Sequence, residues 1–341
     1  MTTVLVTGAG GYIGTVLSEL LLDAGHEVRG LDRMFFGRQT LAHLEGRPGF
    51  QVIRDDIRHV GPEPFEGVDV VMHLAGISND PACDLDPRIT QEVNVDGTMR
   101  VAKHAREAGV SRFIFSSSCS VYGASDGAIL HEDSPRAPVS LYARTKIESE
   151  EDLIGMHADD FAVTMLRNGT VYGISPRMRF DLIINLMTLY AHRNRKIYVL
   201  GGGQQWRPLV HVNDVARAFI AVMDAPLEKV AGEVFNVGET DHNFQTVRVA
   251  QMVRDVLPYT DVELVPDDPD RRSYHVGFDK IRDVLGFEIT RTPHEGIVEI
   301  KQALERGTID DGMRTRTVDY YRFLLEAEQI VREVAYDGAI F

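Results

Sequence analysis

The sequence predicts an α/β fold, a doubly wound parallel sheet with a smaller C-terminal lobe that is interleaved with it in sequence. The first observation is that short, apolar, β-branched runs alternate with longer helical patterns through the first half of the chain, which is typical of βαβ units. The second is a glycine-rich turn directly after the first apolar run. The third is that the alternation becomes irregular near Asn168, before a strand-like run returns at 234–237. A chain of 341 residues can form both a large domain and a lobe.

The predicted elements follow one another in a regular order along the first half of the chain. Strand-like runs lie at residues 3–7, 27–32, 50–55, 68–74, 112–116 and 162–167, and helical patterns lie at 13–24, 89–108 and 141–155. A strand, a crossover helix and a following parallel strand connect in a right-handed sense. This order therefore predicts a parallel sheet with helices on both faces.

The second half predicts the lobe and a tail. Helical patterns near 180–192, 212–223 and 247–256 are separated by loops, and the run at 234–237 is expected to return to the main sheet. The predicted units are a main domain at 1–167 plus about 208–240, a substrate lobe at 168–207 and 241–305, and a helical tail at 306–341. Apolar residues at helical spacing over 318–334 predict that the tail packs as a final helix.

Composition excludes several classes of protein. The chain has 36 Lys and Arg against 51 Asp and Glu, a formal net charge of −15, which opposes broad attraction to nucleic acid or to an anionic membrane. Its two cysteines, Cys83 and Cys119, cannot build a disulfide scaffold and fit a reducing cytoplasm. No apolar stretch reaches the roughly 20 residues of a membrane span. Histidines at metal-ligand spacing are absent from the sequence, so no metal is expected.

A dinucleotide site is predicted at the glycine-rich turn. Gly8 permits the tight turn, Gly11 lets the backbone approach a pyrophosphate, and Gly14 permits close helix packing, while the following helix N-terminus faces the negative charge. Asp32 lies 18 residues after Gly14, at the end of the second predicted strand. Its carboxylate would accept the ribose hydroxyls and repel a 2′-phosphate, which predicts NAD rather than NADP. Asp56, after the third strand, either reaches the adenine or caps a loop.

A second group of residues predicts oxidation of a hydroxyl. Tyr142 and Lys146 stand four apart and share one helical face. An unperturbed phenol titrates near ~10, and positive charge from Lys146 and the oxidised nicotinamide is expected to favour the phenolate as a base. Upstream, a predicted strand ends in a hydroxyl-rich segment, where Ser118 can hydrogen-bond the reacting hydroxyl. His73, on an apolar strand, is expected to be a core histidine rather than a ligand.

Together these motifs resemble the extended short-chain dehydrogenase/reductase family of nucleotide-sugar epimerases and dehydratases. The matching segments are TGAGGYIG at 7–14, HLAG at 73–76, NVDGT with Asn94, SSSCSVYG at 116–123, YARTK at 142–146 and LRNGTVYG at 166–173. The resemblance covers about residues 3–300. It implies a Rossmann domain, NAD as the cofactor, a nucleotide-diphosphate sugar as the substrate and the catalytic residues Ser118, Tyr142 and Lys146.

The resemblance also implies the binding residues. Cofactor contacts are expected from Gly8, Gly11, Tyr12, Ile13, Gly14, Asp32, Asp56, Ile57, Leu74, Ala75, Gly76, Asn94, Tyr142 and Lys146. Substrate contacts are expected from Ser78, Ser120, Asn168, Thr170, Asn185, Arg207, Arg271 and Arg272. Arg207, in a segment similar to the family's RDFVHV, is the expected diphosphate anchor. The sequence departs from the family pattern in two places: Thr170 replaces an asparagine, and the second arginine is displaced to Arg271 or Arg272.

The residues after Ser118 indicate which step succeeds oxidation at C4. The family's 4,6-dehydratases carry Asp then Glu there and its 3,5-epimerases carry a cysteine at the second position, whereas this chain has Cys119 and Ser120. The remaining course is rotation of the 4-keto sugar and return of the hydride, which predicts a 4-epimerase. A dehydratase using other groups, a net C4 oxidoreductase and a noncatalytic dinucleotide sensor are the alternatives. By analogy with relatives, a cytoplasmic homodimer is expected.

Overall fold

A computed structural model describes residues 1–267, 270 and 272–340. Its main sheet has seven parallel strands in the order β11-β7-β5-β4-β1-β2-β3. The strands are β1 (Thr3–Thr7), β2 (Glu27–Asp32), β3 (Phe50–Arg54), β4 (Val70–His73), β5 (Arg112–Ser118), β7 (Ala162–Asn168) and β11 (Val234–Val237). The order reverses between β1 and β4, the point at which doubly wound sheets bind their ligands. The predicted fold class is confirmed, and so is the return of 234–237 to the sheet beside β7.

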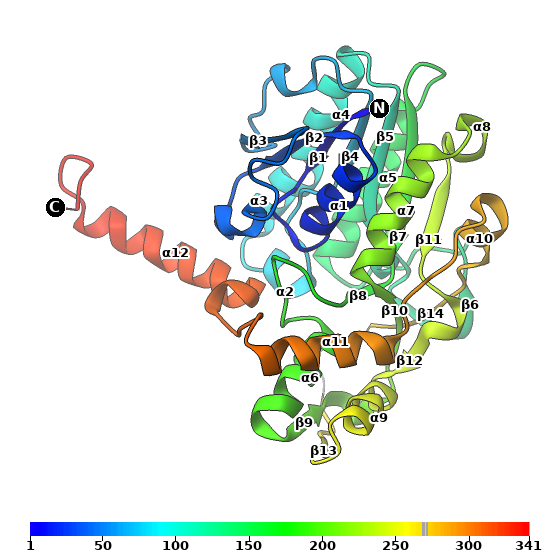
Figure 1. Ribbon diagram of the computed structural model, residues 1–341, viewed down its shortest axis with the longest axis vertical. Coiled ribbons are helices and arrows are strands. Elements are labelled where there is room, and N and C mark those ends of the chain that lie inside the picture. The colour runs from blue at the N-terminus through cyan, green and yellow to red at the C-terminus, as the bar shows by residue number, and fades with distance from the viewer. Residues whose placement is uncertain (268–269, 271, 341) are drawn as a thin grey trace.

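Helices cover both faces of this sheet (Figure 1). On one face lie α1 (Tyr12–Asp23) and α7 (Val212–Asp224), and on the other lie α4 (Gly97–Glu107) and α5 (Leu141–Met156). Successive strand residues point to opposite faces, so Val4 and Val6 pack under α1 whereas Leu5, between them, packs with the α4 side. Strands buried on both faces explain the continuous apolar runs in the sequence.

The helix predicted at 89–108 is interrupted. It begins as α3 (Pro87–Gln91), widens into one π-helical turn at Glu92–Asp96, and continues as α4. Asn94 lies in that wide turn, and its side chain bonds both backbone groups of Ile77, accepting from the nitrogen at 2.7 Å and donating to the oxygen at 3.0 Å. Single π-helical turns inside helices are frequent at functional sites. Here the turn holds the loop that follows β4.

The smaller lobe is built from helices and short sheets below the carboxyl ends of the main strands (Figure 1). Its helices are α6 (Ile183–Asn194), α9 (Thr246–Val256) and α11 (Pro293–Arg306). Its strands form three small sheets: β8 (Thr170–Tyr172), β10 (Trp206–His211) and β12 (Asn243–Gln245); β9 (Lys196–Val199) and β13 (Asp261–Leu264); β6 (Ala124–Leu130) and β14 (Ser273–Val276). Short helices α2 (Asp80–Cys83), α8 (Leu227–Val230) and α10 (Asp279–Leu285) complete the chain.

The tail forms α12 (Thr317–Val334), which runs out from the body and carries the C-terminus away from it (Figure 1). Only its first turns pack: Tyr320 and Tyr321 contact Phe36, with ring centroids 5.6 and 5.7 Å away. Further along, apolar side chains such as Ile330 and Val334 are more than half exposed. The tail thus forms the predicted helix but packs only in part, because beyond the residues that reach the cavity wall its apolar side chains are largely exposed. None of the described helices is both long and apolar enough to cross a membrane.

Candidate active site

The candidate site is a cavity of about 560 Å³ at the carboxyl ends of the main strands. Parallel strands end at this edge of the sheet, and the residues that follow them therefore lie close together. The last residues of five of these strands are Thr7, Asp32, His73, Ser118 and Asn168. The α1 N-terminus, the loop after β4, the start of α5, the lobe and the first turns of α12 form its walls. This is the crevice in which an open parallel sheet binds ligands.

The glycine turn has the shape that a pyrophosphate requires. Gly8 has a φ of +73°, which favours glycine, and a Cβ there would lie 2.8 Å from the nitrogen of Ala75. A Cβ on Gly14 would collide with the carbonyl oxygen of Gly8. Gly11 is the N-cap of α1, and no side chain caps that helix. The first amides of α1 therefore remain for a ligand, and the helix dipole favours an anion.

Asp32 faces the same turn. Its carboxylate accepts hydrogen bonds from the backbone nitrogens of Gly10, at 3.0 Å, and Met34, at 2.6 Å. Burial raises the pKa of Asp32, and these two hydrogen bonds oppose the rise. The side chain is thereby fixed at the end of β2, on the wall of the cavity.

Asp56 is held by two arginines. Arg58 donates to it at 2.7 Å, and Arg33 lies 3.1 Å away. Burial raises the pKa of Asp56, but the hydrogen bonds and charge of Arg58, with the charge of Arg33, outweigh it and lower the pKa overall. Its Oδ1 also accepts the backbone nitrogen of Arg58, at 3.0 Å, so Asp56 caps its own loop while it lines the cavity. Arg33 is therefore paired with the carboxylate of Asp56.

The three predicted catalytic residues meet in the cavity. Tyr142, at the start of α5, hydrogen-bonds Ser118 at the end of β5. Lys146, one turn along α5, is 7% exposed and donates to the backbone oxygen of Ser116 at 2.7 Å. Its ammonium lies 5.8 Å from the centre of the Tyr142 ring. The sequence spacing of four is thus realised as one catalytic face.

Burial is the main influence on the acid–base properties of this group. Burial raises the pKa of Tyr142, and the charge of Asp80 adds to the rise, whereas the hydrogen bond from Ser118 opposes it. Burial also lowers the pKa of Lys146 to about 8. Desolvation outweighs the attraction expected from the sequence, because part of that attraction comes from the positive nicotinamide, which belongs to the bound cofactor.

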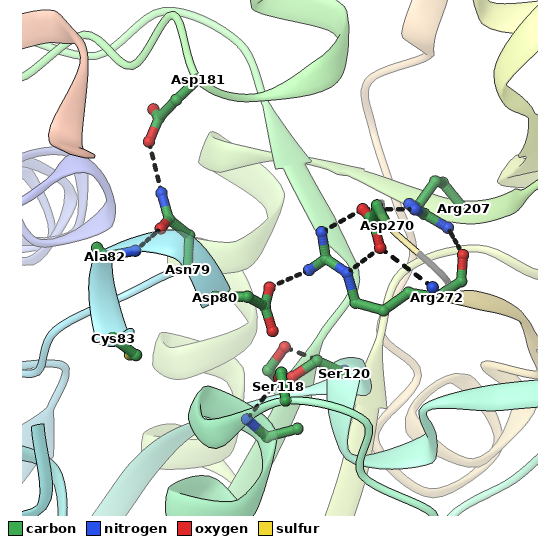
Figure 2. A network of polar contacts seen from close by, with 12 residues as sticks. Asn79, Asp80, Ala82, Cys83, Ser118, Ser120, Asp181, Arg207, Asp270 and Arg272 are labelled. Atoms are coloured by element: carbon green, nitrogen blue, oxygen red, sulfur yellow. Dashed lines mark hydrogen bonds and ion pairs between the residues drawn. The ribbon is translucent and has the colours of Figure 1, made fainter. Parts of the chain in front are cut away.

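A polar wall faces Ser118 and Ser120 across the cavity (Figure 2). Asp80, the first residue of α2, is paired with Nη1 of Arg272. Arg272 also donates to Asp270, through Nε at 2.8 Å and Nη2 at 2.6 Å, and Asp270 lies 2.9 Å from Nη2 of Arg207. Two arginines and two aspartates thus form one connected network.

Comparison with known proteins agrees with this geometry. The family model for the NAD dependent epimerase/dehydratase family matches residues 4–238. The chain belongs to this family. It is 33% identical over 317 residues to the UDP-glucose 4-epimerase of Mycolicibacterium smegmatis, covering 86% of this chain and 96% of that protein.

Solved structures of the family share the fold. A dTDP-glucose 4,6-dehydratase, DesIV from Streptomyces venezuelae, with NAD and TYD bound, has a TM-score of 0.82 and 26% identity, and covers 91% of this chain and 99% of its own. MoeE5 in complex with UDP-glucose and NAD has a TM-score of 0.79 and 26% identity, and covers 90% of this chain and 100% of its own. A second MoeE5 structure holds UDP-glucuronic acid and NAD. The predicted family and the predicted cofactor, NAD, are confirmed.

Most of the residues predicted from the family motifs line the cavity. Those on its wall are Gly8, Gly11, Tyr12, Ile13, Gly14, Asp32, Asp56, Ile57, Leu74, Ala75, Gly76, Ser78, Ser118, Ser120, Tyr142, Lys146, Asn168, Thr170 and Arg272. Arg271 lies outside the described residues. His73, as expected, is a core residue, buried between the hydroxyls of Thr7 and Thr98.

Three of the residues predicted to contact a ligand are not on the cavity wall. Asn94 holds Ile77 from behind and does not line the cavity. Asn185 is fully buried, accepts from Gly173 N and donates to Tyr12 Oη and Arg179 O, so its amide already has partners. Arg207 is also off the cavity wall, because it stands behind Arg272 and donates to the backbone oxygen of that residue. Of the two arginines in this network, Arg272 is the one on the cavity wall.

The sequence motifs missed two arginines from the segment after β8. Arg179 is tied to Asp181 by two hydrogen bonds, at 3.0 and 2.8 Å, and to Ser78 at 3.2 Å. Arg177 is 4% exposed and lines the cavity, yet its Nε and Nη1 have no partner among the described residues. The signal in the sequence was a pair of arginines separated by one residue, shortly after the LRNGTVYG segment. Nη2 of Arg177 donates to Thr317 at 2.9 Å, so two of its three guanidinium nitrogens remain for a ligand, and Arg177 is suited to hold an anion.

The described residues contain no group of His, Cys, Asp and Glu that could hold a metal ion. Trp206 stacks on His275 with ring centroids 5.1 Å apart.

Proposed function

We propose that the protein is an NAD-dependent nucleotide-sugar 4-epimerase. The observation that carries this proposal is the identity of the groups around the Ser118–Tyr142 pair. Cys119 is 1% exposed and points to the backbone oxygen of Arg167, 3.2 Å away, and burial raises the pKa of its thiol. Ser120, the next residue, reaches the cavity with a hydroxyl. Neither supplies the acid or the thiolate that a second step at C5 or C6 would need.

The residues of the site have defined tasks in this proposal. Tyr142 takes the proton of the C4 hydroxyl through its phenol oxygen, while Ser118 donates a hydrogen bond to the oxygen left on C4. NAD held at the α1 turn and Asp32 would supply the hydride acceptor and donor for C4, and rotation of the keto sugar would present its other face to the returning hydride. Lys146 places its charge beneath the phenol and favours loss of its proton. Tyr142 then gives the proton back, so neither net reduction nor loss of water occurs.

The cofactor tasks follow from the walls of the cavity. The α1 amides and Arg177 would hold the pyrophosphate, and Asp32 would accept the ribose hydroxyls. Arg272 would take the diphosphate of the sugar nucleotide, in place of the Arg207 that the sequence favoured. Supporting this, Arg272 and the catalytic pair lie on the same cavity.

Product analysis tests the function. NAD-loaded protein is incubated with UDP-glucose and, separately, with dTDP-glucose, and the nucleotide sugars are separated by chromatography. We expect one of them to reach a mixture with its C4 epimer, and Tyr142→Phe to abolish the conversion. Tyr198→Phe, at a half-exposed tyrosine of the lobe, is the matched control and should convert normally. A keto product that is lighter by one water would contradict the epimerase.

A 4,6-dehydratase is the second candidate, because the structure brings one carboxylate to the site from an unexpected element. Asp80 comes from α2 rather than from the segment after Ser118. It offers a single carboxylate, already paired with Arg272, whereas the family's dehydratases carry an acidic pair. The same chromatogram separates the two candidates.

A further inference from the structure

Three oxygen atoms on the cavity wall have no hydrogen-bond partner among the described residues. They are Oδ1 of Asp80, Oγ of Ser120 and Oδ1 of Asn168, and all three are buried. Buried polar atoms in folded proteins almost always have partners, so these three point to a ligand. The carboxylate and amide oxygens only accept hydrogen bonds. The ligand must therefore bring donors, as the hydroxyls of a sugar do.

Asp80 is fixed in place by its own helix. Asn79 caps α2 by accepting from Ala82 N at 2.9 Å, and its amide nitrogen donates to Asp181 at 2.8 Å. Asn79 has a φ of +79°, an uncommon conformation that this double anchoring maintains. The side chain of Asp80 is 14% exposed, and Figure 2 shows its carboxylate directed toward Ser118 and Ser120. The free oxygen thus faces the cavity on the side of the catalytic serine.

The charges of this wall balance, because Arg207 and Arg272 meet Asp80 and Asp270, but the free oxygen of Asp80 has no donor opposite it among the described residues. Arg272 is paired with both Asp270 and Asp80, and Arg179 is paired with Asp181. The guanidinium of Arg177 lies over the ring of Phe36, 3.7 Å from its centre, and Phe36 belongs to the loop that follows Asp32. Lys146 holds the backbone oxygen of Ser116. A ligand carboxylate brought close to Oδ1 of Asp80 would therefore bring no donor to that oxygen and would meet an acceptor of its own charge, which is unfavourable in a partly buried site.

We propose that Asp80 determines the class of sugar that binds: it accepts a hydroxyl of a neutral hexose and excludes the corresponding uronic acid. The proposal rests on the proposed function in that the ligand is a nucleotide sugar. The proposal goes beyond that function, because a 4-epimerase acts on C4 whatever group C6 carries. Asp80 acts through its charge and one oxygen, whereas Tyr142 and Ser118 act on the reacting carbon.

Binding of two sugars that differ only at C6 tests this. UDP-glucose and UDP-glucuronic acid are titrated calorimetrically into NAD-loaded protein, and the same pair is repeated with dTDP as the nucleotide. For the nucleotide that binds, we expect the glucose form to bind at least about tenfold more tightly. Asp80→Asn should reduce this ratio at least about fivefold, mainly by improving uronate binding. Asp84→Asn, the same change at an exposed position of the same turn, should leave the ratio unchanged.

The ratio of the two affinities separates a role in specificity from a structural role, since loss of structure would weaken the binding of both sugars together. Thermal unfolding and NAD binding show whether Asp80→Asn is folded, and Ser120→Ala is a second variant that should weaken the glucose form. Equal affinities in the wild type, an unchanged ratio in Asp80→Asn, or no binding of either sugar with either nucleotide would overturn the proposal. Because binding needs no turnover, a retained ratio without epimerisation would refute only the proposed function. Epimerisation with an unchanged ratio would refute only the role of Asp80.

Discussion

Replacing Lys146 with methionine should stabilise the ligand-free protein while it abolishes activity. Burial lowers the pKa of Lys146 from 10.5 to about 8, and one pKa unit is about 1.4 kcal/mol, so the buried charge costs about 3 kcal/mol at neutral pH. The variant loses the hydrogen bond to Ser116 O, worth about 1 kcal/mol. The free energy of unfolding should therefore rise by about 2 kcal/mol at pH 7.

The gain in stability should depend on pH in a defined direction. Below pH 8 the lysine is charged in both states and the full cost is present. Between pH 8 and 10.5 the lysine is neutral in the folded protein and still protonated in the unfolded one. The cost of the buried charge therefore falls, and the free energy of unfolding of the wild type rises relative to that of the variant. Urea unfolding without NAD at pH 7 and pH 10 measures both values. Lys103→Met, at an exposed lysine of α4, is the control. A variant that is less stable than the wild type at pH 7, or whose advantage does not change with pH, would refute the reasoning.

Three further changes test the cofactor and the chemistry. Asp32→Ala should narrow the preference for NAD over NADP by at least about tenfold, because a like charge facing the 2′-phosphate is removed; tighter NADP binding by the wild type would refute the assignment. Tyr142→Phe should keep NAD binding and lower kcat by about 10²–10⁴-fold. A variant that retains half of the activity would exclude Tyr142 as the acid–base group of the mechanism. Arg177→Met should weaken NAD at least about tenfold, with the exposed Arg144→Met unaffected; equal affinities would exclude Arg177 from the pyrophosphate site.

The sequence carried enough information for the sheet and the cofactor turn, because both depend on local patterns. Apolar runs buried on both faces identified the parallel strands, and the turn at Gly8 and Gly14 tolerates no Cβ. Tyr142 and Lys146 share a helix, so their spacing fixed their geometry. In each case the relevant contacts lie within one element or between neighbours in the chain.

The substrate wall could not be predicted in the same way. Asp80 and Arg272 are 192 positions apart, and nothing local in either segment indicates that they meet. The residues after Ser118 predict that no carboxylic acid reaches the site, whereas one arrives from α2. Asn185 and Arg207 were placed in the site by family motifs, but tertiary packing gives their side chains protein partners.

The tail shows a different limit. The apolar spacing over 318–334 correctly predicted a helix, α12. A pattern of apolar residues shows that a face can be buried, but it does not show what buries it. In the described chain only the beginning of that face, at Tyr320 and Tyr321, finds its partner on the loop that carries Phe36.

Isotope transfer tests the central claim, reversible oxidation at C4, most directly. The NAD-loaded protein is given the nucleotide glucose that it binds, labelled with deuterium at C4, in ordinary water, and the unlabelled sugar in deuterium oxide. We predict that the C4 epimer keeps the C4 label in the first case and gains no deuterium on carbon in the second, because the same hydride leaves and returns. A product lighter by one water, or one carrying solvent deuterium on carbon, would contradict the 4-epimerase.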